Sequence, residues 1–112
     1  MCLLVEIPAP SDEKLFLGIL ERGNFIQVSL GDEKPPNIAE KIFISEEGEH
    51  GCITAALDFV NDILEERVVI AKQMSWTSFF LTDPTSFVDT DDLNQKRYSS
   101  VASWKGTHTF LA

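Results

Sequence analysis

The chain has 112 residues, with 18 acidic side chains against 9 basic ones and a formal net charge of −9. A surface of this sign repels phosphate groups, which proteins bind with Lys and Arg, so nucleic acid and anionic membranes are not expected partners. The length fits a single globular domain over residues 1–112. A core of that size folds without disulfides or metal. The sequence has neither a glycine-rich phosphate loop nor the paired spacings of metal ligands, so we expect no cofactor and no metal site.

Features of the sequence also bear on its location. Cys2 and Cys52 are too few for the disulfide framework of a small secreted scaffold. Glu6 interrupts the short apolar run at the start, which has no basic residues before it and does not fit a signal peptide. No apolar run approaches the ~20 residues that span a bilayer. We therefore expect a soluble, cytoplasmic protein.

The first half of the chain has the pattern of short strands. Residues 2–7 favour a strand that ends at Pro8 and Pro10. Residues 14–21 and 25–30 flank a turn at 22–24, which predicts a hairpin. The loop signal at 31–37 is the strongest in the chain, and residues 41–45 favour a fourth strand.

The second hairpin strand alternates along its length, so its side chains divide between two faces. One face is predicted to carry Ile26, Val28 and Leu30, and the other Phe25, Gln27 and Ser29.

The clearest element is an amphipathic helix over residues 51–66. At about 100° per residue, its apolar side chains fall on one face, as a core-facing helix requires. They are Ile53, Ala56, Leu57, Phe59, Val60, Ile63 and Leu64. The opposite face is polar, with acidic residues along it.

After the helix, the β-branched run 68–71 is typical of a strand covered on both faces. Residues 76–82 favour a strand that ends at Asp83-Pro84. Between 91 and 105 two interpretations compete: a short helix near 90–98 followed by extended structure, or a strand over 98–104 after one helical turn. Together these elements predict an α+β domain with one mainly antiparallel sheet of four to six strands and the 51–66 helix packed on one face.

Few residues have the pattern of a catalytic or metal site. A thiol at a helix N-terminus can become a nucleophile, with His50 as base for Cys52. The helical wheel instead directs Cys52 toward the core, where cysteine acts as a small hydrophobe. The paired spacings of zinc ligands are missing, and Asp89, Asp91 and Asp92 lack the glycine and glutamate of a calcium loop, so a helix cap is the better interpretation.

The acidic face of the helix is the sharper functional signal. Asp58 and Asp62 stand four residues apart, as do Asp62 and Glu66, and each like-charge pair costs about 0.2–0.5 kcal/mol. Asp62, Glu65 and Glu66 also crowd the negative end of the helix dipole, and Arg67 relieves only part of this. Conflicts of this kind often mark functional sites, although a solvated face in an acidic protein would look the same.

We therefore expect a non-enzymatic acidic binding protein that docks or neutralises a basic protein partner, for example an immunity-type inhibitor of a cationic toxin. The expected partner-binding residues are Asp58, Asp62, Glu65 and Glu66, joined by the aromatic anchors Tyr98 and Trp104. Two alternatives stay open. One is a small thiol-dependent enzyme that uses Cys52 and His50, and the other is a homodimeric structural module with the C-terminal aromatics at its interface.

Overall fold

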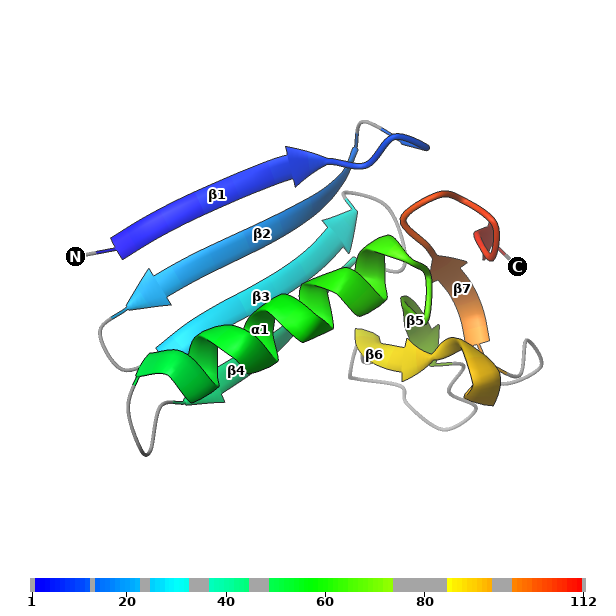
Figure 1. Ribbon diagram of the computed structural model, residues 1–112. Helices are drawn as coiled ribbons and strands as arrows, with labels where there is room; N and C mark the ends of the chain where they lie inside the picture. Colours follow the sequence, from blue (N-terminus) through cyan, green and yellow to red (C-terminus); the bar gives the residue numbers. More distant parts are fainter. Residues whose placement is uncertain are drawn as a thin grey trace, which may run out of the picture.

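The computed structural model describes residues 2–12, 14–22, 25–32, 37–44, 49–73, 85–93 and 98–111. These residues form two antiparallel sheets with one long helix packed against them, which confirms the predicted α+β class (Figure 1). The first sheet has the order β1 (Cys2–Pro8), β2 (Leu15–Arg22), β3 (Phe25–Asp32), β4 (Ile38–Ile44). Helix α1 (Glu49–Leu64) leads to the second sheet, whose order is β6 (Thr85–Asp89), β5 (Val68–Gln73), β7 (Tyr98–Ala102), β8 (Phe110–Leu111).

The predicted hairpin is confirmed. Arg22 of β2 pairs with Phe25 of β3, so only two residues connect the strands. Val28 and Leu30 are fully buried and Ile26 packs against the same core, as the alternating pattern predicts. The hydrophobic alternation therefore fixed the register of this sheet, because a slip of one residue would turn the buried side chains to solvent.

Helix α1 begins and ends two residues before the predicted range of 51–66. Its buried stripe is Cys52, Ala56, Phe59 and Ile63, and the helix lies across β3 and β4 (Figure 1). The Phe59 ring contacts both sheets, because its centroid lies 5.7 Å from that of Phe43 in β4 and 4.8 Å from that of Phe87 in β6. The helix therefore joins both sheets in one core.

The predicted apolar face of α1 was too wide. Ile53 is 42% exposed and Leu57 is 59% exposed, whereas Val60 and Leu64 are partly buried against the core. A single helix about 10 Å wide covers only part of a four-stranded sheet, since strands are about 4.8 Å apart. Side chains at the flank of the stripe therefore meet no partner element.

The strands form two sheets where the sequence predicted one. Because α1 is 16 residues long, about 24 Å, it carries the chain to the end of the first sheet, where β5 starts the second (Figure 1). The interpretation of 68–71 as a doubly covered strand is confirmed. Val68 and Ile70 face the main core, while Val69 and Ala71 belong to a smaller cluster on the other side.

In the last third of the chain, the described residues test some of the predictions. The predicted strand at 76–82 lies outside the described residues. Of the helix predicted near 90–98, the described residues form a 3-10 turn over Thr90–Asp92, which ends at Leu93 with extended backbone angles. Residues 94–97 lie outside the described residues. Strand β7 then forms over Tyr98–Ala102, as the competing interpretation had it. Asp89 occupies the N-cap position of the turn, but its side chain makes no capping hydrogen bond.

Within the described residues, no helix has the length and apolar character needed to cross a membrane.

Candidate functional site

The C-terminus of α1 ends in a Schellman motif, which brings its acidic residues into a fixed loop. The Arg67 N–H donates to the Asp62 carbonyl at 2.8 Å, and the Glu66 N–H donates to the Ile63 carbonyl at 3.1 Å. Glu66 therefore occupies the left-handed position with φ of 58°, where glycine is the usual residue.

The side chain of Glu66 is turned inward from this position. Its carboxylate accepts hydrogen bonds from Thr107 Oγ1 at 2.7 Å and from the Thr107 N–H at 3.2 Å. Burial raises the pKa of Glu66, but hydrogen bonds from Ser103, from Thr107 and from the Lys105 backbone outweigh it, so the pKa lies below its ordinary value. Glu66 thus ties the end of α1 to the chain after β7.

A second tie joins the end of α1 to the turn after β6. Thr90 Oγ1 donates to the Glu66 carbonyl at 2.5 Å, and the Thr90 N–H donates to the Arg67 carbonyl at 2.9 Å. These bonds hold the acidic residues around Thr90 against the acidic end of the helix. Two acidic segments that are far apart in the sequence therefore meet in one place.

Between the two segments lies a depression of about 540 Å³, which we call the acidic depression. Its lining residues are Asp62, Glu66, Arg67, Val68, Asp89, Thr90, Asp91 and Asp92. Asp89, Asp91 and Asp92 are exposed, and the one base in the lining, Arg67, has its Nε 2.8 Å from Asp62 Oδ1. Because several carboxylates surround a single cation, the depression is suited to attract further positive charge.

The predicted acidic site residues separate into two groups. Asp58 and Glu65 are exposed on the outside of the helix and just beyond its end. Asp62 is half-buried in the acidic depression and already paired with Arg67, while Glu66 is 8% exposed and bonded inward. The structure therefore leaves Asp58 and Glu65 as the members of this set that are open to a partner.

The two predicted aromatic anchors lie apart from this site. Trp104 is 7% exposed in the main core, and its carbonyl accepts a hydrogen bond from Ser11 Oγ at 2.8 Å. Tyr98 is half-buried and packs against the cluster around Val69 and Val101. Both rings contribute to packing in the described structure.

Sequence reasoning missed Asp89, Asp91 and Asp92 as neighbours of the helix acids, because it treated them as a separate helix cap. Thr90 is 24 residues from Glu66, and no local pattern links the two. The one available signal was the shared acidic character of both segments.

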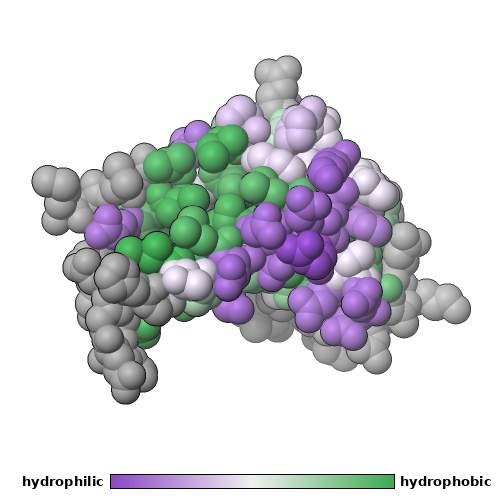
Figure 2. All heavy atoms as spheres, in the orientation of Figure 1, coloured by the Kyte–Doolittle hydropathy of each residue, from purple (hydrophilic) through white to green (hydrophobic). Residues whose placement is uncertain are grey.

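The face of the molecule that carries the acidic depression also carries exposed apolar side chains, which we call the apolar strip. Its members are Val5 (36% exposed), Ile7 (42%), Ile53 (42%) and Leu57 (59%). Val5 and Ile7 pair with Ile19 and Leu17, so they lie on the sheet face that α1 covers in part. Figure 2 shows apolar side chains over β1, β2 and the adjoining part of α1, next to a hydrophilic region.

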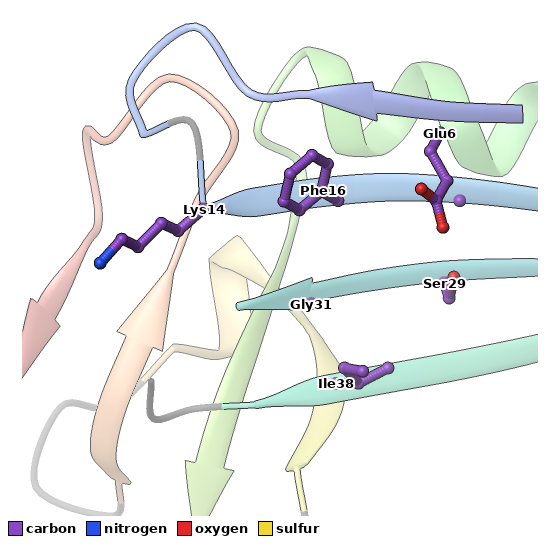
Figure 3. A pocket seen from close by; sticks show the side chains of 7 residues that line it. Glu6, Lys14, Phe16, Ser29, Gly31 and Ile38 are labelled. Carbon is purple, nitrogen blue, oxygen red and sulfur yellow. The ribbon is translucent and has the colours of Figure 1, made fainter. Parts of the chain in front are cut away.

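A groove lies on the opposite face of the first sheet (Figure 3). Phe16 and Ile38 flank the groove, and Gly18 and Gly31 form its floor. A Cβ added at either glycine would collide with a side chain of the next strand. A Cβ at Gly31 would come 2.3 Å from Ile38 Cγ1. Gly18 pairs with Ser29 and Gly31 pairs with Phe16, so the two glycines are diagonal neighbours on β2 and β3, and neither has a side chain to fill the groove.

The thiol of the alternative enzyme hypothesis, Cys52, is nearly inaccessible to solvent. Cys52 is 7% exposed, and its Sγ donates to the Phe43 carbonyl at 2.9 Å. His50 lies in the first turn of α1, and its side chain is outside the described part of the structure. Among the described residues, no group of three or more His, Cys, Asp or Glu side chains is placed to hold a metal ion.

Comparison with protein families, with curated proteins and with solved structures finds no match to this chain. The functional argument therefore starts from the acidic depression and the apolar strip themselves.

Proposed function

We propose that this protein is a non-enzymatic binding module that docks a basic protein partner on the face shared by the apolar strip and the acidic depression. The observation that supports it is the convergence of Asp89, Asp91 and Asp92 with the acidic end of α1. A net charge of −9 adds a long-range attraction for a cationic partner and speeds its encounter. An immunity-type inhibitor of a cationic toxin is one function of this kind.

The exposed surface of α1 offers apolar contacts and then acidic contacts along its length. The exposed apolar side chains come first along the chain, at Ile53 and Leu57, and the exposed acids follow at Asp58 and at Glu65 just beyond the helix. Protein interfaces combine an apolar centre with a polar rim. A fitting partner surface would place Lys or Arg side chains beside one or two apolar side chains, with the basic groups over the acidic depression.

The first experiment removes acidic charge from this face and identifies what no longer binds. The test variant combines Asp58→Asn, Glu65→Gln and Asp91→Asn. The matched control removes the same number of exposed carboxylates from the first sheet with Glu6→Gln, Glu21→Gln and Glu40→Gln. Proteins captured from the native host by each form are identified by mass spectrometry, and the best candidate is purified for calorimetry.

We expect a basic protein that binds the wild type and the control, and that binds the test variant about tenfold more weakly, or 1.4 kcal/mol. The affinity should fall as salt is added, because exposed charges are screened. Equal loss of affinity in both variants would mean that net charge alone drives binding. A captured partner that is acidic, or is insensitive to the test variant, would overturn the proposal.

The second experiment tests the apolar half of the surface. Leu57→Ser removes an apolar side chain that is 59% exposed, so folding stability should change little. If Leu57 inserts into the partner, the affinity should fall by about tenfold or more, as for an interface anchor. Thr54→Ser, one turn earlier on the exposed side, serves as the control and should leave the affinity unchanged.

A further inference from the structure

Among the described strands, β1 is the terminal strand of the first sheet and pairs with a neighbour, β2, along one edge (Figure 1). We call its other edge the free edge. Its backbone bonds identify which residues face that edge. The Ala9 N–H donates to the Leu15 carbonyl at 2.7 Å, in register with the pairing of Ile7 with Leu17. In an antiparallel pair such residues alternate, so Val5 and Ile7 direct their N–H and C=O groups to β2.

The even-numbered residues therefore direct their backbone groups outward. Along the free edge these are the N–H groups of Cys2, Leu4 and Glu6 and the carbonyls of the same residues and Pro8. Pro8, which has no N–H, falls on the outward side, where a proline disturbs no bond within the sheet. The edge thus presents a row of donors and acceptors whose complement is another extended strand.

We propose that a second copy of this chain supplies that strand, with β1 pairing antiparallel to β1 across a two-fold axis. Full overlap of Cys2–Pro8 with its own copy centres the axis on Val5. In this register the Leu4 N–H bonds the Glu6 carbonyl of the second copy, and the Glu6 N–H bonds its Leu4 carbonyl. The Cys2 N–H meets the Pro8 carbonyl, so every outward N–H of the strand obtains an acceptor.

The side chains favour the same register. Val5 stands opposite Val5 of the second copy, and both Val5 and Ile7 lie on the face that carries the apolar strip. Glu6 stands opposite Leu4, so the two carboxylates do not face each other, whereas a shift of the axis to Glu6 would oppose them at a cost. The two apolar strips would become continuous across the axis.

Charge does not prevent this assembly at the edge itself. Glu6 is the one charged residue in β1. The described residues that line the acidic depression come from the end of α1, the start of β5, the end of β6 and the Thr90–Asp92 turn, and none of them belongs to β1. Each copy still has a net charge of −9, so repulsion opposes dimerisation at low salt. The dimer fraction should therefore rise with added salt, opposite to the response expected for a basic partner.

The first test uses a proline on the free edge. Glu6→Pro removes an outward N–H and leaves the bonds to β2, whereas the control Glu6→Ala removes the same charge and keeps the N–H. Analytical ultracentrifugation over a range of concentrations should show a dimer for the wild type and Glu6→Ala, and loss of the dimer for Glu6→Pro. If Glu6→Pro unfolds, Val5→Lys replaces it, since it places two ammonium groups opposite each other.

The second test fixes the register. Opposed residues between hydrogen-bonded pairs have Cα atoms about 4.5 Å apart, a distance that a disulfide spans. In a Cys2→Ser background, Val5→Cys should give a disulfide-linked dimer under mild oxidation, and Glu6→Cys should give much less because it faces Leu4.

A wild type that stays monomeric at every concentration and salt level overturns the proposal. So does a dimer that Glu6→Pro leaves intact, or equal crosslinking through Val5→Cys and Glu6→Cys. A monomer that pairs β1 with an added peptide of residues 2–8, but not with its own copy, would assign the edge to a peptide ligand instead. The tests of the proposed function change Asp58, Leu57, Glu65 and Asp91, and none of these residues belongs to β1, so the failure of one proposal is distinguishable from the failure of the other.

Discussion

Glu66 combines a backbone conformation that favours glycine with a buried carboxylate that only an acidic side chain supplies. Its φ of 58° ends α1, and its carboxylate holds Thr107. From the sequence, Glu66 was expected to bind a partner at the acidic end of the helix. Its inward role was not predicted, because the contact with Thr107 spans 41 residues. A buried charge can be deduced only when its donors are known, and nothing local marks Ser103 or Thr107 as donors.

These two properties of Glu66 can be separated by substitution. Glu66→Ala removes the carboxylate and keeps a Cβ in the left-handed conformation, so it should destabilise the fold by about 2–3 kcal/mol. Glu66→Gly removes the carboxylate but relieves the backbone, so it should be about 1 kcal/mol more stable than Glu66→Ala. Urea unfolding of the three forms measures both differences. Equal stability of the Ala and Gly variants would contradict the strained backbone.

The charge of Glu66 predicts a dependence of stability on pH. Its pKa in the folded protein lies below the ordinary value of 4.5, so ionised Glu66 stabilises the fold above that value, and this contribution is lost as the pH falls through the folded pKa. Glu66→Gln should therefore be less stable than the wild type at pH 7 by about 1–3 kcal/mol. The gap should narrow below pH 4.5. A gap that is constant between pH 7 and pH 3 would show that the carboxylate acts through shape alone.

At the scale of elements, hydrophobic periodicity predicted the positions of helices and strands better than it predicted which of their apolar side chains are buried. The alternation of 25–30 correctly predicted the faces of β3, and the wheel correctly directed Cys52 inward. Ile53 and Leu57 have the same apolar character as the buried positions, so only the placement of α1 over β3 and β4 shows them to be exposed. Local sequence does not encode how far a helix lies from a sheet edge.

Gly18 and Gly31, which line the groove on the first sheet, give a prediction at this scale. A Cβ at Gly31 would meet the Cγ1, Cβ and Cα atoms of Ile38, whereas a Cβ at Gly18 would approach mainly the Ser29 hydroxyl at 2.6 Å. The Ser29 hydroxyl can rotate away from a new Cβ at Gly18. At Gly31 the Cβ and Cα atoms of Ile38 are 3.1 Å and 3.2 Å from the new Cβ, and they cannot move without the strand. Gly31→Ala should therefore destabilise the protein by about 1–3 kcal/mol, and Gly18→Ala by less than about 1 kcal/mol. Thermal unfolding of both variants measures this order, and the reverse order would contradict the groove geometry.

For the whole molecule, the predicted helix and strands indicated the α+β class and the composition indicated an acidic surface, while the division into two sheets required the structure. The decisive feature is the length of α1, which places β5 beyond the first sheet. The acidic depression depends on the same arrangement, because β6 and the Thr90–Asp92 turn reach the end of α1 only when the second sheet stacks there. Both the fold topology and the site therefore follow from one long-range placement.

Charge across the whole molecule gives the last prediction. Among the described residues, Arg67–Asp62 is an ion pair on one rim of the acidic depression, and the exposed acids of the opposite rim repel one another. Added salt should therefore raise the melting temperature of the protein, because about 0.5 M salt shortens the Debye length to only a few ångströms.

The position of the repulsion can be tested with two charge-matched variants measured at low protein concentration. The first neutralises the depression with Asp89→Asn, Asp91→Asn and Asp92→Asn, and the second neutralises the first sheet with Glu6→Gln, Glu21→Gln and Glu40→Gln. Because the depression concentrates its carboxylates, its variant should melt higher than the wild type at low salt and gain less from added salt. The sheet variant should keep most of the wild-type response, since its carboxylates lie on separate strands. Identical responses in the two variants would show that the repulsion is spread evenly over the molecule, and would remove the depression as a focus of negative potential.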